Sequence, residues 1–287
     1  MEIDALNHAP GAPNTFLPLS VFVIARNEAD RIGAALSAVR DLTDDIILVD
    51  SGSTDGTQDA ARRHGARVVF NPWPGYGPQK RFAEDLCRYD WVLNVDADEV
   101  IPPDLAAEIR ALFMPEGPRR DAYRIRIAEI SPNEEHPHPL AHALAPVRLY
   151  RRSVGRYASS TVHDRVQLPP GTEAPRLRGI IHHRSARSLS HQVIKLNAYS
   201  DMQADDLERR GKAMPALRIL TEFPLAFLKA YVLRRHFVRG LDGYVSAINY
   251  AFSRHLRLAK HLERRRRTNS NSPIHRENGL PREIADT

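Results

Sequence analysis

The chain contains the segment Trp91-Val92-Leu93-Asn94-Val95-Asp96-Ala97-Asp98-Glu99, in which apolar residues lead directly into three carboxylates. The apolar part is typical of a buried strand in a parallel sheet that is covered on both faces. Ligands bind at the edge of such a sheet where the strands end. Asp96 and Asp98 are two residues apart at this edge, so they can hold a hard divalent cation such as Mg²⁺ or Mn²⁺ between them. A cation there can neutralise a diphosphate, which favours a nucleotide-activated substrate.

Strand and helix patterns alternate around this segment. Continuous apolar runs predict strands at 19–25, 46–49, 67–70 and 91–95. Apolar residues at helical spacing predict helices at 29–40, 55–64 and 79–88. Further along, the patterns predict a helix at 102–114, strands at 123–130 and 147–151, and helices from 188 to about 267. Strands that alternate with helices of about ten residues form βαβ units, so the sequence predicts an α/β domain with a parallel sheet.

Composition indicates an ordinary globular protein of a reducing compartment. Hydrophobic residues make up 42% and charged residues 26% of the chain, as in soluble globular domains. The single cysteine, Cys87, can form no internal disulfide. The first 18 residues lack the apolar core of a signal peptide, and no stretch approaches the ~20 apolar residues of a membrane span. We therefore expect a cytoplasmic protein.

Positive charge is concentrated near the C-terminus. Between residues 229 and 267 there are eleven Lys and Arg residues against Asp242 and Glu263, a net charge of +9, whereas the whole chain carries +6. A basic segment on a slightly acidic body suggests a local anionic partner. The segment lacks interleaved aromatic residues and any recognition motif for nucleic acid. Nucleic acid is therefore not an expected partner.

Two other predicted strands also end in polar residues. The second ends in Asp50-Ser51-Gly52-Ser53-Thr54-Asp55-Gly56-Thr57, and the first in Ala25-Arg26-Asn27-Glu28. A capped turn accounts for Asp55 and the glycines but not for a carboxylate at Asp50, and a ligand at the helix N-terminus is the alternative. Neither the G-x-G-x-x-G fingerprint nor the P-loop pattern is present here, which argues against an NAD enzyme and a P-loop NTPase.

Together these segments resemble the family 2 glycosyltransferases with the GT-A fold. The resemblance is closest to the bacterial branch that includes the lipopolysaccharide core β-1,4-glucosyltransferases, and it covers roughly residues 18 to 260. The segments that show the resemblance are residues 24–28, 50–57, 77–83, 96–99, 148–152, 162–164 and 183–185. The resemblance implies a Rossmann-like nucleotide-diphospho-sugar transferase fold, a mostly parallel sheet flanked by helices, with a helical C-terminal appendage.

The same resemblance implies a domain organisation. The expected parts are a disordered tail at 1–17, a GT-A catalytic domain at 18–186, a helical region at 187–267 and a disordered polar tail at 268–287. The catalytic domain would consist of a donor half at 18–115 and an acceptor half at 116–186.

Residue roles follow from the resemblance position by position. Glu28 and Asp55 would contact the nucleoside of the donor, with Lys80 or Arg81 near its ribose or phosphates. Asp98, assisted by Asp96, would hold Mg²⁺ or Mn²⁺ against the diphosphate, and the cation would stabilise the departing nucleotide. The other expected donor contacts are Ala25, Asn27, Asp50, Ser51 and Ala97. His183 is a further candidate metal ligand, although a histidine at a strand end is more often structural.

An inverting transferase also needs a base that takes a proton from the acceptor hydroxyl. The matching position is Asp164, where relatives usually carry a glutamate, so the carboxylate is one methylene shorter. His163 is the alternative base because its unperturbed pKa, near ~6.5, suits the task. In a purely structural interpretation both residues only close a strand end. We predict Asp164 as the base.

A histidine-rich loop departs from the pattern of the family. His136, His138 and His142 follow two acidic residues, and such side chains can bind zinc. The spacing matches no standard zinc signature, and prolines stiffen the segment. We therefore predict an exposed loop over the acceptor side.

The C-terminal region has an amphipathic pattern. Apolar residues recur at helical spacing from Tyr244 to Leu262, with basic residues largely on the opposite face, among them Arg254, Arg257 and Arg264. Such a helix can lie in an anionic membrane interface, and the alternative is a helix packed on the catalytic domain with a solvated basic face. We include residues 229–267 as a candidate membrane surface.

The sequence therefore predicts a metal-dependent, inverting glycosyltransferase. It would move a sugar from a nucleotide-diphosphate donor, by resemblance a UDP-hexose, to a lipopolysaccharide-core or other envelope glycan or a lipid-linked sugar. Its place would be the cytoplasmic face of the inner membrane. The alternative is a non-catalytic sugar-nucleotide or glycan-binding protein with the same fold.

Overall fold

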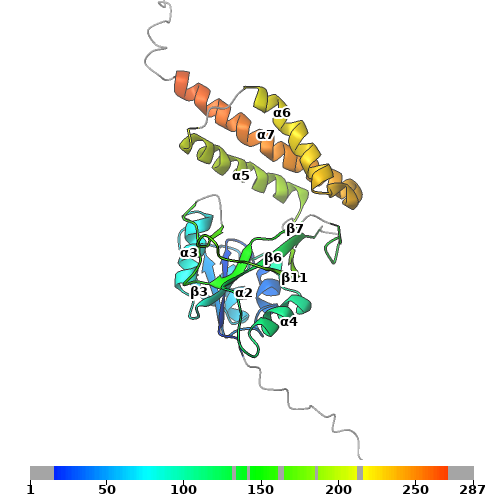
Figure 1. Ribbon diagram of the computed structural model, residues 1–287. Coiled ribbons are helices and arrows are strands. Elements are labelled where there is room, and N and C mark those ends of the chain that lie inside the picture. The colour runs from blue at the N-terminus through cyan, green and yellow to red at the C-terminus, as the bar shows by residue number, and fades with distance from the viewer. Residues whose placement is uncertain are drawn as a thin grey trace, which may run out of the picture. The chain divides into compact units, whose positions relative to one another are not determined.

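The computed structural model describes residues 16–130, 134–140, 143–160, 165–184, 187–211 and 216–270. The chain forms two compact units, one of Met1–Pro137 and Ala143–Ser185 and one of His138–His142 and Ala186–Thr287 (Figure 1). The predicted tail at 1–17 and the polar tail at 268–287 lie almost entirely outside the described residues.

One sheet of nine described strands runs through the first unit. Its first half is parallel: β1 (Leu19–Ala25) lies between β2 (Asp45–Asp50) and β4 (Trp91–Asn94), and β3 (Arg67–Phe70) pairs with β2. The other strands of this sheet are β5 (Glu99–Val100), β6 (Ala122–Glu129), β7 (Ala143–Leu144), β8 (Val147–Arg151) and β11 (Arg176–His183). β8 pairs antiparallel with both β4 and β6, and β11 runs parallel to β6 and antiparallel to β5. The predicted α/β fold is confirmed, with parallel pairing among β1 to β4 and mixed pairing in the rest of the sheet.

The structure also contains a separate two-stranded sheet. It pairs β9 (Arg156–Tyr157) with β10 (Val166–Gln167) in antiparallel fashion. The sequence patterns did not predict β5, β7, β9 or β10, because two-residue strands are too short to show periodicity. They also missed the eight-residue strand β11, in which arginines and histidines interrupt the apolar residues.

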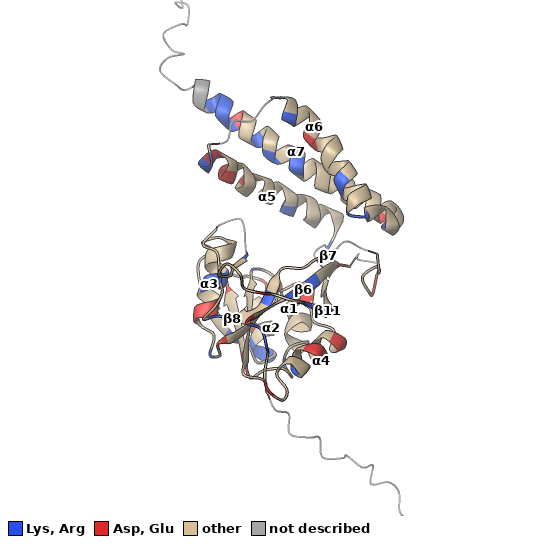
Figure 2. Ribbon diagram, in the orientation of Figure 1, with Lys and Arg blue, Asp and Glu red and all other residues tan. Residues whose placement is uncertain are grey.

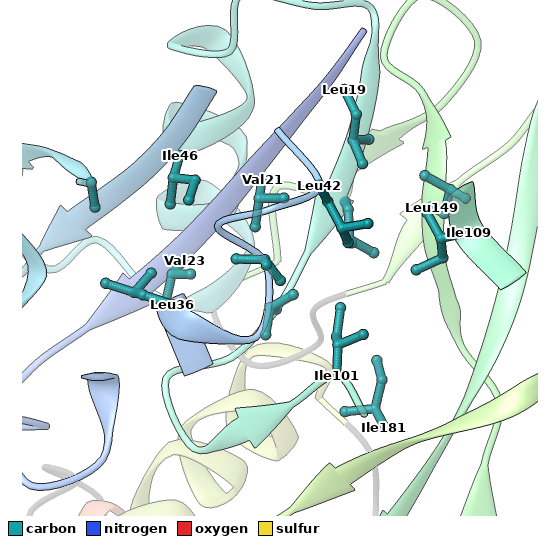
Figure 3. Packing of buried hydrophobic residues seen from close by; sticks show 14 of the residues in the cluster. Leu19, Val21, Val23, Leu36, Leu42, Ile46, Ile101, Ile109, Leu149 and Ile181 are labelled. Atoms are coloured by element: carbon teal, nitrogen blue, oxygen red, sulfur yellow. The ribbon is translucent and has the colours of Figure 1, made fainter. Parts of the chain in front are cut away.

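Helices cover both faces of the parallel half. They are α1 (Ile32–Ser37), α2 (Thr57–Arg63), α3 (Tyr76–Asp85) and α4 (Pro103–Leu112). Side chains of α1, α2 and α4 pack on one face of the sheet, as Figure 3 shows for Leu36 near Val23 and for Ile109 near Leu149. Ala83 of α3 packs on the other face against Phe22 and Ile24. All seven residues of β1 are buried, which explains why its sequence is continuously apolar.

The second unit is helical. It contains α5 (Leu189–Arg209), α6 (Ala216–Leu228), a π-helical turn at Lys229–Leu233, a 3₁₀ turn at His236–Arg239, and α7 (Gly240–Ser270). Both α5 and α6 pack against α7. Across the described residues, no helix combines the length and the apolar character that crossing a membrane requires.

Candidate active site

The loops after β1 and β2 meet at the carboxyl edge of the sheet, because Ala25 and Asp50 are partners in the β1–β2 register. The backbone N–H of Asn27 donates to Ser53 Oγ at 2.9 Å, and the side-chain Oδ1 of Asn27 accepts from the Thr54 N–H at 2.9 Å. Asn27 has a φ of +56°, a left-handed conformation that asparagine tolerates better than most residues. The two loops therefore form one hydrogen-bonded corner.

Asp55 holds the same corner together. Its Oδ2 accepts from the N–H of Ala29 at 3.1 Å, and its Oδ1 accepts from the N–H of Thr57 at 3.1 Å. The N–H of Glu28 donates to the Thr57 hydroxyl at 2.8 Å. Partial burial alone would raise the pKa of Asp55, but these hydrogen bonds outweigh it and lower the pKa. Asp55 is thus an ionised cross-link between the loops. The N-cap residue of α2 is Gly56, and Asp55 accepts from the N–H of the first helical residue, Thr57.

Asp50 is fully buried and serves the turn that follows it. Its Oδ1 accepts from the N–H groups of Gly52 and Ser53 at 3.0 and 2.9 Å and from the Gln58 side chain at 2.8 Å. Gln79 of α3 donates to the neighbouring Ser51 hydroxyl at 3.0 Å. The carboxylate at this strand end is therefore explained by the turn and needs no ligand to satisfy it.

Asp96 lies between two cations. Lys80 of α3 places Nζ 2.9 Å from Oδ1 of Asp96, and Arg148 of β8 places Nη2 3.0 Å from Oδ2. Burial alone would raise the pKa of Asp96, but the charges of Arg148 and Lys80 hold it far below its usual range. Arg81, the neighbour of Lys80, donates to the backbone oxygen of Tyr157 at 3.2 Å.

Glu99 completes this buried cluster. Its Oε1 accepts from Arg148 at 2.8 Å, and its Oε2 accepts from the backbone N–H of Asp96 at 2.9 Å. Burial raises the pKa of Glu99, and the neighbouring Asp96 charge adds to the rise against the opposing effect of Arg148. Arg148 also donates to Asn94 at the end of β4. The network therefore fixes the backbone at the point where the strand turns into the acidic segment.

Asp98 faces a different set of groups. Its Oδ2 lies 3.3 Å from His183 Nε2 at the end of β11 and 3.6 Å from Arg31 Nη1. Arg31 also donates to the backbone oxygen of Arg184 at 2.7 Å and pairs with Glu28 at 2.9 Å. Burial alone would lower the pKa of His183, but the hydrogen bond and charge of Asp98 raise it. Glu28, Arg31, Asp98 and His183 are thus brought together from three separate segments.

The donor set at Asp98 fits a hard divalent cation. A carboxylate oxygen and an imidazole nitrogen converge there, and Mg²⁺ is usually held by one or two protein groups together with substrate phosphates. Within the described residues, no cluster of three or more His, Cys, Asp or Glu side chains forms a complete cage. Nη2 of Arg31 is buried there without a hydrogen-bond partner from the described residues, as suits a guanidinium that receives an anion.

Several expected residues are found elsewhere or lie outside the described part of the chain. The predicted base Asp164 and its alternative His163 belong to 161–164, which the structure does not describe, as is also true of His142. The described ends of that segment are tied to the first unit: Ser160 accepts from the Gly77 N–H at 3.0 Å, and Ala158 donates to Arg165 at 3.0 Å. His136 packs its ring against His182 with centroids 6.0 Å apart.

Sequence reasoning assigned no role to Arg31, Glu99 or Arg148. Arg148 belongs to one of the segments that carry the family resemblance, and Glu99 is the third carboxylate of the opening segment. Their charge was visible in the sequence, but Arg148 is separated from its partners Asp96 and Glu99 by 52 and 49 positions along the chain. Arg31 lies in the first turn before α1, where a solvent-exposed arginine is the ordinary expectation.

Comparison with known proteins identifies the family of the chain. Residues 20–167 match the family model described as Glycosyl transferase family 2. A protein of Rickettsia prowazekii named as an uncharacterised glycosyltransferase is 40% identical over 250 residues, covering 84% of this chain and 86% of the relative. The lipopolysaccharide core biosynthesis glycosyltransferase LpsC of Rhizobium meliloti is 29% identical over 262 residues, covering 86% and 93%. Among solved structures, glucosyl-3-phosphoglycerate synthase of Mycobacterium tuberculosis aligns with a TM-score of 0.44 and 21% identity over 68% of this chain and 81% of that chain.

Proposed function

Because the chain belongs to glycosyltransferase family 2, we propose that it is a metal-dependent, inverting transferase that uses a nucleotide-diphosphate sugar. The expected family and α/β fold class are confirmed, and the chain is accordingly an enzyme of the glycosyltransferase class. The observation that supports the finer proposal is the convergence of Asp98, His183 and Arg31 at the carboxyl edge of the sheet.

The proposed division of work separates the two aspartates. Asp98 and His183 are the groups that would hold Mg²⁺ or Mn²⁺, and the bound cation would supply Lewis-acid stabilisation to the leaving diphosphate. Asp96 is committed to Lys80 and Arg148, so we assign it a positioning role that keeps the acidic segment in place. Arg31, with its buried Nη2, would bind a phosphate oxygen beside this pair.

The donor nucleoside would lie at the corner formed by the loops after β1 and β2. Glu28 remains the proposed side-chain contact there, together with the backbone of Ala25, Asn27 and Ala97. Asp55, Asp50 and Ser51 would contribute by shaping the corner, since their oxygens already take part in hydrogen bonds within it. Lys80 and Arg81 would support the site indirectly, Lys80 through its ion pair with Asp96 and Arg81 through its hydrogen bond to Tyr157, rather than by contacting the ribose.

The proposal for the acceptor is based on the predicted base and on one relative. Asp164, with His163 as the alternative, would take the proton of the acceptor hydroxyl as its oxygen attacks the anomeric carbon and the nucleotide diphosphate leaves. The relative named for lipopolysaccharide core biosynthesis supports a core or other envelope glycan as the acceptor. UDP-hexose is the proposed donor.

Calorimetric titration tests the donor site. UDP, GDP, ADP and CMP are titrated with and without Mn²⁺ into the wild type, Asp98→Asn and the control Asp41→Asn, whose side chain is 75% exposed. We expect one nucleotide to bind in a Mn²⁺-dependent manner to the wild type and the control but not to Asp98→Asn. Absence of nucleotide binding in the wild type under every condition would overturn the proposal.

A transfer assay then separates catalysis from mere binding. Sugar incorporation into an extracted core glycan is followed for the wild type, Asp164→Asn and His163→Ala, and the anomeric configuration of the product is read by NMR. We expect inversion, with transfer lost in Asp164→Asn. Nucleotide binding by a wild-type protein that never transfers sugar to any tested acceptor would support the non-catalytic alternative instead.

A further inference from the structure

We propose that the second unit binds anionic membranes through an apolar surface on α6, the turns that follow it and the start of α7. Six of its large side chains, called here the apolar surface, are between 48% and 83% exposed: Leu220, Leu225, Leu228, Leu233, Phe237 and Leu241. Six exposed apolar side chains of this size within residues 220–241 favour an interaction site over ordinary protein surface. The inference concerns the helical unit alone and does not depend on the transfer reaction.

Four basic residues of α7 pair within the helical unit. Arg254 and Arg257 both lie 3.0 Å from Glu222 of α6, and Lys260 lies 2.8 Å from Asp201 of α5. Arg264 pairs with Asp205, also on α5. Figure 2 shows blue Lys and Arg positions along α7 and red Asp and Glu positions toward one end of α5. The cations predicted to face lipid from residues 254–264 instead join the three helices to one another.

The packing of α6 is inverted with respect to a soluble helix. Its small residue Ala226 and the following Ala230 are buried in the helical unit, as are Ala247 and Ala251 of α7, whereas the leucines of α6 point outward. A soluble amphipathic helix buries its large apolar residues instead. In a helix that contacts lipid, small residues lie between the helices and large apolar residues face outward, as they do here.

The charges near this surface select an anionic partner. Residues 216–245 contain five Lys and Arg residues against Glu222 and Asp242. Glu222 is itself neutralised by Arg254 and Arg257, so the local balance is more positive than the count suggests. Lys229 and Arg235, both exposed, border the apolar surface. A bilayer with anionic headgroups satisfies both the apolar and the cationic groups, whereas a second copy of this chain would bring like charges together.

The geometry of the segment suits shallow insertion. α6 has 13 residues, too few for the ~20 that a membrane span needs. Pro224 interrupts its backbone hydrogen bonding, and the chain then reverses through Arg235 and Gly240, which have φ values of +59° and +56°. A Cβ at Gly243 would lie 1.7 Å from the His236 carbonyl oxygen, so the reversal packs tightly on the start of α7. The 3₁₀ turn is therefore held against the start of α7, directly after the turn that ends α6.

Vesicle flotation with the full chain tests the inference. Wild type is mixed with vesicles of phosphatidylcholine alone or with 30 mol% phosphatidylglycerol (about one anionic lipid in three). We expect flotation only with the anionic vesicles, and at least a tenfold loss of partitioning in the triple variant Leu225→Gln/Leu228→Gln/Leu233→Gln. The control Val193→Gln/Ile194→Gln removes two exposed apolar residues of α5 and should float as wild type does. Wild type that ignores anionic vesicles, or a triple variant that floats unchanged, overturns the inference.

A fluorescent probe locates the contact without relying on a loss of binding. Cys87 is buried, and burial raises its pKa to about 12, so a thiol introduced at the surface is the reactive one. Leu225→Cys and the control Ile194→Cys are labelled with an environment-sensitive dye. We expect anionic vesicles to shift the emission to shorter wavelength at 225 and not at 194. No shift at 225, or equal shifts at both positions, contradicts the proposed surface.

Light scattering identifies the competing occupant. A wild-type dimer that the triple variant converts to a monomer, without vesicle binding by either, assigns the apolar surface to a second copy and overturns the membrane inference. UDP titration is run on the same samples. Nucleotide binding without flotation defeats this inference alone, and flotation without nucleotide binding defeats the proposed function alone.

Discussion

Nζ of Lys80 lies 2.9 Å from Oδ1 of Asp96, and the Lys80 side chain is only 1% exposed. The first aspartate of the acidic segment is therefore neutralised from within the protein, by a lysine on α3 and by Arg148 on β8. The second aspartate, Asp98, faces His183 and Arg31 instead. Two carboxylates separated by one residue thus have different electrostatic surroundings, which is the basis of the first two predictions.

Replacing Lys80 by methionine should destabilise the fold. Removal of one partner from a buried ion pair typically costs about 3–5 kcal/mol of stability. Because Asp96 keeps its ion pair with Arg148, we expect a loss of about 3 kcal/mol. The measurement is the free energy of unfolding in urea. The control Arg62→Met breaks an exposed pair with Asp59, at 2.9 Å, and should cost less than about 1 kcal/mol. Equal losses in the two variants would show that Lys80 is not a structural counter-ion.

Replacing His183 by glutamine should weaken Mn²⁺-dependent UDP binding. The loss should exceed about tenfold, since even outer-shell residues of metal sites contribute 10–100-fold. The control is His182→Gln, which alters the adjacent histidine of the same strand, whose ring packs on His136 rather than on Asp98. Calorimetry in Mn²⁺ and in EDTA measures both variants. A loss that persists equally in EDTA would indicate that His183 acts on the nucleotide without a metal.

Replacing Gly77 by alanine should impair transfer more than donor binding. An added Cβ would lie 2.0 Å from the Ala158 oxygen and 2.6 Å from the Ser160 oxygen, so the chain just before the predicted base must move. A displacement of about 1 Å near reacting groups can reduce the rate on the order of 10²-fold. Gly171→Ala, whose Cβ would meet nothing within 4 Å but whose φ of +83° strains an alanine, is the control for backbone strain away from this contact. Unchanged kcat in Gly77→Ala would show that this contact does not position the acceptor side.

Glu222 should make the helical unit sensitive to acid. Burial alone would raise its pKa, but Arg254 and Arg257 lower it. Because the folded-state pKa is below the unfolded value of about 4.3, the stabilisation is complete above that pH and is lost as the pH falls through the folded value. Glu222→Gln should therefore lower stability at pH 7 by roughly 1–2 kcal/mol and flatten its dependence on pH below about 5.

The matched control for this prediction lies on the same helix pair. Glu263→Gln removes an exposed carboxylate that pairs with Arg267 at 2.7 Å, and it should change stability little at any pH. Chemical denaturation between pH 3 and pH 7 follows both variants. An acid transition of the wild type that Glu222→Gln leaves unaltered would assign it to other carboxylates.

Much of the βαβ part of the sheet was predictable because its signals are local. β1, β2, β3 and β4 were predicted within two residues, since strands buried on both faces are continuously apolar in sequence. α1 is shorter than predicted, Ile32–Ser37 against 29–40, because residues 27–31 form the hydrogen-bonded corner instead of a first helical turn. The spacing of Asp96 and Asp98 likewise identified the acidic edge without any structure.

The basic C-terminal helix shows the limit of such patterns. Arg254, Arg257 and Arg264 share one face of α7, and periodicity alone could not distinguish a face toward solvent or lipid from one that pairs with neighbouring helices. Their partners, Glu222, Asp201 and Asp205, lie on α6 and α5, more than 30 residues away. The outward leucines of α6 were equally invisible as a surface, since an apolar helix looks the same in sequence whether its leucines face in or out.

The sequence by itself determined the βαβ order, the position of the sheet edge and the family, because each depends on residues close together in the chain. The tertiary structure alone decided that Asp96 is held by Lys80 and Arg148 while Asp98 meets His183 and Arg31. These contacts join β4 to α3, β8, β11 and the loop after β1, and electrostatic pairing depends on distance in space. The sequence specifies where each carboxylate occurs, but the charges that surround it come together only when the chain has folded.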